Sequence, residues 1–70
     1  MNNKYETLAM QIFFNGRLDD AMMKKANVEF KPGKERADVI RAFNKGWSAG
    51  AGKFEREAMM AGNEIAKVCQ

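Results

Sequence analysis

The apolar residues in the C-terminal half of the chain keep the spacing of one helical face, and this pattern constrains the fold most strongly. The stripe passes the three glycines of "GWSAGAGK" without losing phase. Its members are Ile40, Phe43, Trp47, Gly50, Phe54, Ala58, Ala61, Ile65 and Val68, at intervals of three or four residues. Such intervals are typical of an amphipathic helix. We therefore predict one long helix from about Lys34 to Val68, with room for a kink at Gly50–Gly52; the alternative is a loop at "GAG" between two shorter helices.

The glycines inside this predicted helix require a reason, because each lowers helix stability by about 1 kcal/mol relative to alanine. Ala42, Gly46 and Gly50 follow one another at intervals of four residues and form a bare ridge. A second helix could approach such a ridge closely, and the contact would offset the lost propensity. We predict a helix-packing role for these three residues.

Two shorter helices are predicted before the long one. Asn2 or Asn3 can cap the first helix, and Gly16 can end it. The apolar face of this helix consists of Tyr5, Leu8, Ala9, Ile12 and Phe13. The second is predicted over Leu18–Ala26, with aspartates in its first turn and lysines in its last, the order that a helix dipole favours. The chain is therefore expected to form a single all-α domain over residues 1–70.

The segment "NVEFKPG" interrupts the helical pattern. Val28 and Phe30 alternate with polar neighbours, which indicates a short extended piece. Pro32-Gly33 is typical of a turn.

Residues that could carry catalysis are scarce. The chain has no histidine and one cysteine, so it lacks the commonest general base and the usual zinc ligands. Asp19 and Asp20 are adjacent and do not face a common point on a helix. "GAGK" matches only part of a phosphate-binding loop. We expect no enzyme activity, no metal and no cofactor.

The setting is expected to be the cytoplasm. No run of apolar residues approaches the length of a membrane span, and the N-terminus has no cleavable signal pattern. Cys69 cannot form an internal disulfide, and we expect it to be a free thiol at a frayed chain end in a reducing compartment.

A partner-binding surface is predicted from apolar residues that lie outside the expected core and from a nearby basic turn. Large apolar residues fall on both faces of the first helix, and a 70-residue chain is too short to surround them. Methionines are common on adaptable binding surfaces. The net charge is +3, and residues 24–45 alone carry a surplus of four positive charges, which would steer an acidic partner. The predicted partner-binding residues are Met10, Phe14, Met22, Met23, Lys31, Lys34 and Arg36. A homodimer is expected for the same reason.

The segment "RAFNKGWSAGAGK", residues 41–53, resembles the first helix of ribosome modulation factor, a family of small basic bacterial proteins that bind ribosomal RNA. The resemblance implies that Arg41, Lys45 and Lys53 contact phosphates, and that Gly46 and Gly50 allow close approach to RNA. Trp47 could then be a stacking platform, although its phase with the apolar stripe favours a buried anchor.

These patterns favour a small non-enzymatic accessory protein of the kind that phages and mobile elements encode. We expect it to bind and modulate or inhibit a host macromolecule, with a protein favoured as the target. The alternative is an RNA- or ribosome-binding factor, so that the partner is a host protein or a ribonucleoprotein.

Overall fold

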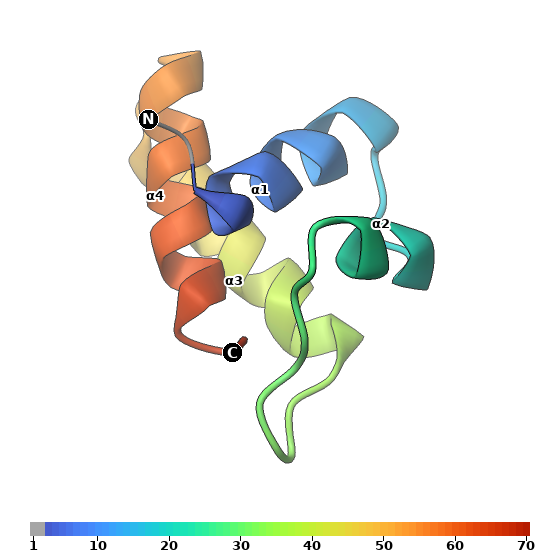
Figure 1. Cartoon of the computed structure of the whole chain (residues 1–70). Coiled ribbons are helices and arrows are strands. Elements are labelled where there is room, and N and C mark those ends of the chain that lie inside the picture. The colour runs from blue at the N-terminus through green and yellow to red at the C-terminus, as the bar shows by residue number, and fades with distance from the viewer. Residues whose placement is uncertain (1–2) are drawn as a thin grey trace.

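Four helices make up the fold of residues 3–70, which are the residues that the computed structural model describes (Figure 1). The helices are α1 (Lys4–Asn15), α2 (Asp20–Lys25), α3 (Arg36–Ala49) and α4 (Phe54–Ala66). The only strand-like pairing in this part of the chain is an isolated antiparallel bridge between Phe30 and Cys69. The predicted all-α class is confirmed.

The predicted long helix is wrong, because the chain reverses direction between α3 and α4. Ala51 and Gly52 both adopt left-handed backbone conformations, with φ of 55° and 79°, which no helix continues through. The two helices then pack side by side as a hairpin, which Figure 1 shows in yellow-green and orange. The chain therefore adopts the alternative, a loop at "GAG" between two shorter helices.

The predicted ridge of small residues lies where α3 meets α4. Ala42, Gly46 and Gly50 are all buried. A Cβ atom on Gly46 would come closer than 3.0 Å to backbone atoms of Ala61, and one on Gly50 would come equally close to the backbone of Glu57. Glycine is therefore required at both positions by the close approach of the two helix backbones.

The caps of α1 and α2 account for their bounds. Asn3 accepts a hydrogen bond from the backbone N–H of Glu6 at 2.8 Å, while the alternative cap, Asn2, lies outside the described residues. Gly16 ends α1 in a left-handed conformation, as predicted. α2 is shorter than the predicted Leu18–Ala26, because the side chain of Asp19 accepts from the backbone N–H of Met22 at 3.0 Å and so caps the helix one residue after Leu18.

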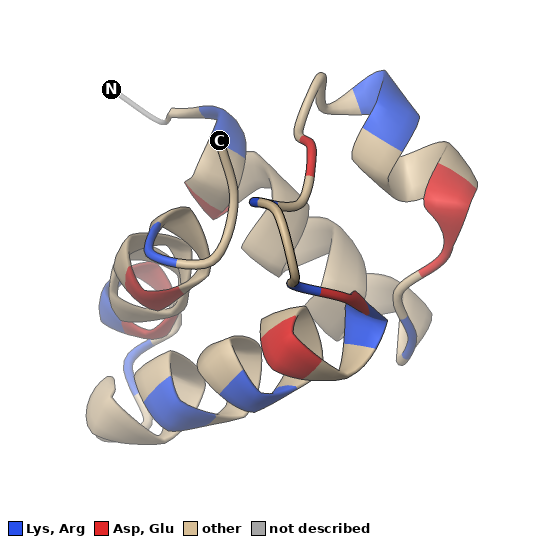
Figure 2. Cartoon of the chain, turned by 90° about the horizontal axis from the view of Figure 1, so that it is seen from below, with Lys and Arg blue, Asp and Glu red and all other residues tan. Residues whose placement is uncertain are grey.

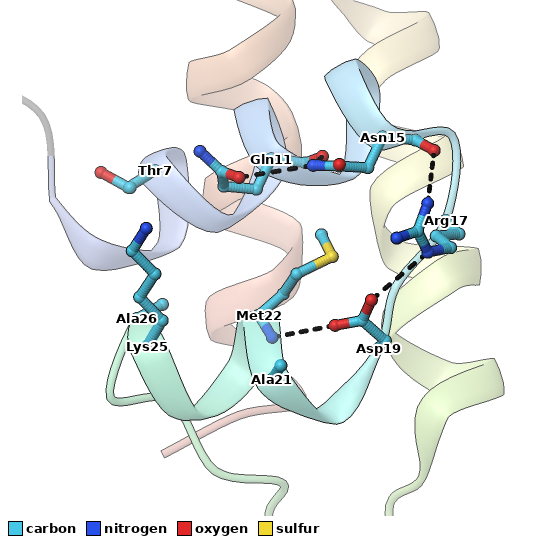
Figure 3. Close-up of a pocket in the computed structure, with 9 residues that line it drawn as sticks. All are labelled: Thr7, Gln11, Asn15, Arg17, Asp19, Ala21, Met22, Lys25 and Ala26. Atoms are coloured by element: carbon cyan, nitrogen blue, oxygen red, sulfur yellow. Dashed lines mark hydrogen bonds and ion pairs between the residues drawn. The ribbon is translucent and has the colours of Figure 1, made fainter.

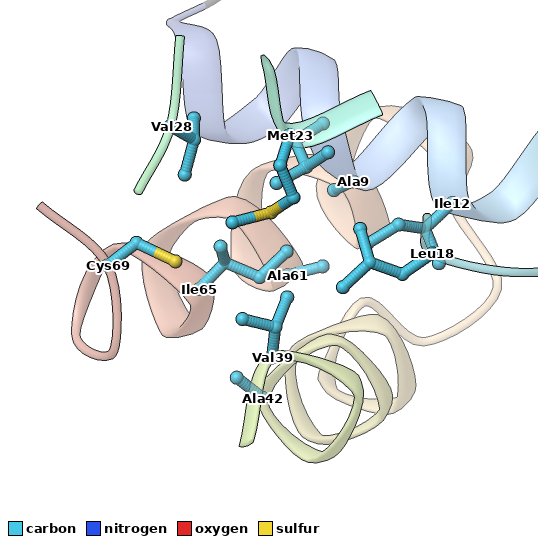
Figure 4. Close-up of a cluster of buried hydrophobic side chains, with 11 residues drawn as sticks. Ala9, Ile12, Leu18, Met23, Val28, Val39, Ala42, Ala61, Ile65 and Cys69 are labelled. Carbon is cyan, nitrogen blue, oxygen red and sulfur yellow. The ribbon is translucent and has the colours of Figure 1, made fainter. Parts of the chain in front are cut away.

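The core beneath these helices is aliphatic (Figure 4). Its buried members come from all four helices and from the segments between them: Leu8, Ala9, Ile12, Leu18, Met23, Val28, Val39, Ala42, Ala61, Ile65 and Cys69. None of these buried residues is aromatic. The aromatic side chains therefore lie at the margin of the core or on the surface.

The C-terminal segment is bound to the loop before α3, and the expectation that Cys69 lies at a frayed end is wrong. The Gln70 N–H donates to the Glu29 carbonyl at 2.8 Å, and the Lys31 N–H donates to the Val68 carbonyl at 3.1 Å. Cys69 between them is 2% exposed. Val28 and Phe30 thus form the short extended piece that their alternation predicted, and Pro32-Gly33 forms the turn after it.

We expect the Cys69 thiol to react with thiol reagents only when the protein opens. Burial raises the pKa of this thiol above its usual 9.0, so the folded state favours the neutral form. The free energy that this group contributes to folding is therefore fully present below pH 9 and is lost as the pH rises through the higher folded pKa. At pH 8, labelling by an aromatic disulfide should be slow in buffer and fast in denaturant. Equal rates in the two solutions would show that the C-terminal bridge does not protect the thiol.

Candidate functional site

Five aromatic rings form one connected cluster at the surface, and we call it the aromatic surface. Its members are Phe13, Phe14, Phe43, Trp47 and Phe54. Each ring centroid lies 4.5–5.8 Å from that of at least one other member. Phe13, Phe14 and Phe54 are 47%, 68% and 38% exposed, whereas Phe43 and Trp47 are half-buried against the core.

Three helix ends bring these rings together. The reversal at residues 50–53 places Phe54, the first residue of α4, 5.7 Å from Trp47 in the last turns of α3. Phe13 and Phe14 are in the last turn of α1, which packs against α4. Phe13 stacks on Trp47 with ring centroids 4.5 Å apart and an angle of 14° between the ring planes. The cluster therefore depends on the hairpin and cannot exist in one straight helix.

The area that the cluster exposes is substantial for so small a protein. With an aromatic side chain presenting about 200 Å², the three exposed phenylalanines leave on the order of 300 Å² of aromatic surface in contact with water. The largest apolar patch on a typical monomer is about 300–600 Å² and is often functional. The aromatic surface falls within this range.

Trp47 is committed to contacts within the protein. It stacks on Phe13 and also on Phe43, with a centroid distance of 5.1 Å and an interplanar angle of 26° for the second pair. Its role as an anchor at the margin of the core explains its phase with the apolar stripe. A stacking platform for nucleobases would need a ring face that is free.

The four apolar residues predicted to bind a partner separate into three environments. Phe14 lies in the aromatic surface, and Met10, one helical turn before it, is half-buried. Met22 is half-buried and faces a groove between α1 and α2. The expectation that Met23 lies outside the core is wrong: it is 5% exposed and belongs to the core cluster. Met22 and Met23 are adjacent on α2, and their side chains point about 100° apart around the helix. The packing that buries Met23 therefore leaves Met22 partly exposed.

The predicted basic turn does not adjoin the aromatic surface. It precedes α3, whereas Phe43 and Trp47 lie about 10 Å and 17 Å further along that helix. Lys31 donates to the Lys67 carbonyl at 3.0 Å, and Arg36 pairs with Asp20 at 2.9 Å and donates to the Leu18 carbonyl. Lys34 is exposed. Two of the three cations therefore help to hold segments of the fold together.

Two of the three cations predicted to contact RNA are paired with carboxylates. Arg41 lies 2.6 Å from Asp38, and Lys45 lies 3.6 Å from Glu64 across the hairpin. Lys53 is exposed at the start of α4 and forms no ion pair within the described residues. Figure 2 shows blue and red segments side by side along α3 and α4, so this face of residues 3–70 is not a continuous basic stripe.

The carboxylates in these pairs stay charged to low pH. A hydrogen bond from the Glu35 backbone N–H and the charge of Arg41 lower the pKa of Asp38. A hydrogen bond from Lys67 and the charge of Lys45 lower the pKa of Glu64. Partial neutralisation of Arg41 and Lys45 therefore persists over the physiological range.

Other kinds of site have little support in residues 3–70. Within this range no three histidine, cysteine, aspartate or glutamate side chains gather as a metal site requires. None of the helices described has the length and apolar character that crossing a bilayer would take.

Comparison of the chain with protein-family models, with curated proteins and with solved structures finds no match.

Proposed function

We propose that this chain is a non-enzymatic binding protein that docks a segment of another protein on its aromatic surface. The observation that carries the proposal is the exposure of Phe13, Phe14 and Phe54 in one connected cluster outside the core. Aromatic side chains are enriched at the centres of protein interfaces because each buries a large area with little loss of conformational freedom. A partner that covers these rings removes on the order of 300 Å² of aromatic area from water.

The size of the surface favours a short segment as its occupant. A stable interface between folded proteins buries about 800 Å² on each side, more than the exposed phenylalanines offer. The total accessible area, 4506 Å², is close to the roughly 4,400 Å² expected for a monomer of this mass, so the fold does not depend on a second copy to become compact. An amphipathic helix that offers two or three apolar side chains fits this area.

The charges near the rings favour acidic residues in that segment. Arg17 lines a small cavity together with Phe13 and Phe43, and Lys53 immediately precedes Phe54. The net charge of +3 adds a long-range attraction in the same direction. We infer an occupant whose apolar side chains are flanked by aspartate or glutamate.

Binding of this kind would inhibit the partner protein, because the bound segment could no longer make its usual contacts. That mode of action agrees with the accessory protein of phage type that the sequence suggests. A protein is favoured over RNA as the target, because Trp47 is stacked on other rings of this chain and both Arg41 and Lys45 are paired with carboxylates. RNA would bind at this face only if its phosphates replaced the carboxylates that pair with Arg41 and Lys45. Such a replacement is feasible because surface ion pairs are weak.

Selection of peptides from a random library on the immobilised protein tests the proposal. We expect enriched peptides to carry apolar residues at helical spacing with acidic neighbours, to lose binding to Phe14→Ser and to keep binding to Met60→Ala. Met60 is the matched control because it is a half-buried methionine of α4 that belongs neither to the aromatic surface nor to the groove between α1 and α2. The affinity should fall only modestly with salt, since apolar contacts carry most of the binding and only the flanking charges are screened.

Three outcomes would overturn the proposal. A selection in which no enriched peptide loses binding to Phe14→Ser would remove the aromatic surface from the interaction. Light scattering that shows a dimer at about 10–100 µM, a range typical of weak association, and a monomer for Phe14→Ser would make a second copy the occupant. RNA binding that weakens steeply with salt and survives Phe14→Ser would establish the alternative target.

A further inference from the structure

A groove lies between α1 and α2 (Figure 3), and Arg17 at one end of it also lines the cavity beside Phe13. Its volume is about 380 Å³, within the range of about 300–1,000 Å³ that is usual for ligand sites. Gln11 faces this groove, and Phe13, two residues further along α1, belongs to the aromatic surface. Because two residues on a helix are 200° apart, the helix offers its opposite sides to the two features.

One wall of the groove is a polar row along α1. Thr7, Gln11 and Asn15 follow at intervals of four residues, which places them about 6 Å apart along the helix axis. Residues i and i+2 of an extended peptide are about 6.6–6.8 Å apart. The row therefore nearly matches the repeat at which an extended backbone presents its N–H and carbonyl groups to one side.

The row retains hydrogen-bonding groups for such a backbone. Asn15 uses its amide nitrogen to donate to the Gln11 carbonyl at 2.8 Å and to the Gln11 side-chain oxygen at 3.4 Å. Within residues 3–70 this leaves the amide nitrogen of Gln11 as a donor and the side-chain oxygen of Asn15 as an acceptor, with no hydrogen bond to either. One donor and one acceptor are what a peptide unit needs.

One end of the groove is cationic, the other end holds an ion pair, and the wall opposite α1 is apolar. Figure 3 shows Lys25 at one end and Arg17 at the other, with Met22 reaching up from α2 between them. Arg17 is paired with Asp19 at 3.3 Å, whereas Lys25 has no ion pair within the described part of the chain. Lys25 is therefore the position where a ligand carboxylate gains most.

From this geometry we infer that the groove binds an extended acidic peptide segment of about five residues. The backbone of the segment pairs with Gln11 and Asn15, and a small apolar side chain lies on Met22. A carboxylate at one end binds Lys25, and a carboxylate at the other end approaches Arg17. Five extended residues span about 13 Å between their outer Cα atoms, close to the 12 Å from Thr7 to Asn15 along α1.

Titration of the ¹⁵N-labelled protein with a defined pentapeptide tests the inference. The probe is acetylated and amidated, with glutamate at both ends and three alanines between them. We expect saturable shifts of the Gln11, Met22 and Lys25 amide signals and no shift of the Trp47 indole. A peptide with glutamine in place of glutamate should bind about tenfold more weakly, because charge-assisted hydrogen bonds are the stronger ones.

Two variants in the last turn of α2 separate the site from general charge attraction. Lys25→Gln should weaken binding about tenfold, while Lys24→Gln, which removes the same charge from a residue that does not line the groove, should change it less than twofold. Equal losses in the two variants, or no saturable shifts with millimolar peptide, would overturn the inference. Phe14→Ser should leave this binding intact, so the groove and the aromatic surface can fail independently.

Discussion

Replacing Gly46 by alanine is expected to destabilise the protein by about 2 kcal/mol, although alanine is the better helix former. The added methyl group would lie closer than 3.0 Å to the backbone of Ala61, and backbone atoms cannot move aside as a flexible side chain can. The hairpin would have to separate along the contact that joins α3 to α4. For a domain of this size the melting temperature should fall by about 10 °C.

A matched substitution on the outside of the same helix gives the control. Ser48 is exposed on α3, so Ser48→Ala gains helix propensity without meeting another element. We expect this variant to melt at the same temperature as the unaltered protein or slightly above it. A rise for Gly46→Ala as well would mean that α3 and α4 do not approach closely in solution, and Gly46→Leu would then be tolerated too.

The sequence predicted the class of the fold because α1, α3 and α4 carry periodic apolar faces, and because α2 has aspartates in its first turn and lysines in its last. Gly16, Asn3 and the Pro32-Gly33 turn act as their residue types suggest. The hairpin was not predicted, and the reason is physical. When two helices fold back on each other, each turns its part of the apolar stripe toward the other helix. Unbroken phase therefore cannot distinguish one long helix from two, and the left-handed conformation of Ala51 has no signal in its residue type.

The aromatic surface was only partly predictable from the sequence. The sequence indicates Phe14, because it lies off the main stripe of α1. Phe13 and Phe54 have the spacing of the apolar stripes, and their exposure follows from their places at the ends of helices, away from the aliphatic core. Periodicity reports which face of a helix a residue occupies, but not that the ends of three helices meet. Met23 shows the same limit, since only the placement of α2 decides which of two adjacent methionines is buried.

Truncating Met10 and Phe14 together to alanine is expected to weaken partner binding by about thirtyfold or more while leaving the protein folded. Phe14 is 68% exposed, and its contacts are ring edges at the margin of the cluster, 5.5 Å from Phe13 and 5.7 Å from Phe54. Loss of these contacts should lower the free energy of unfolding by about 1 kcal/mol, against about 3–5 kcal/mol for a buried phenylalanine. An aromatic residue at the centre of an interface commonly contributes 2 kcal/mol or more to binding, a loss of about thirtyfold.

Thermal melts and binding titrations with the selected peptides, run on the same preparations, decide the matter. Met60→Ala supplies the comparison, because it removes a methionine side chain of similar burial from α4, outside both the aromatic surface and the groove between α1 and α2. A double variant that unfolds would place Met10 and Phe14 among the residues that hold the monomer together. One that melts and binds like the unaltered protein would leave the exposed rings without a role, and the exposure of Phe13 and Phe54 would then need another explanation. Only the combination of a nearly unchanged melt with lost binding assigns these side chains to a partner, since stability and recognition are separable here only if the rings lie outside the core.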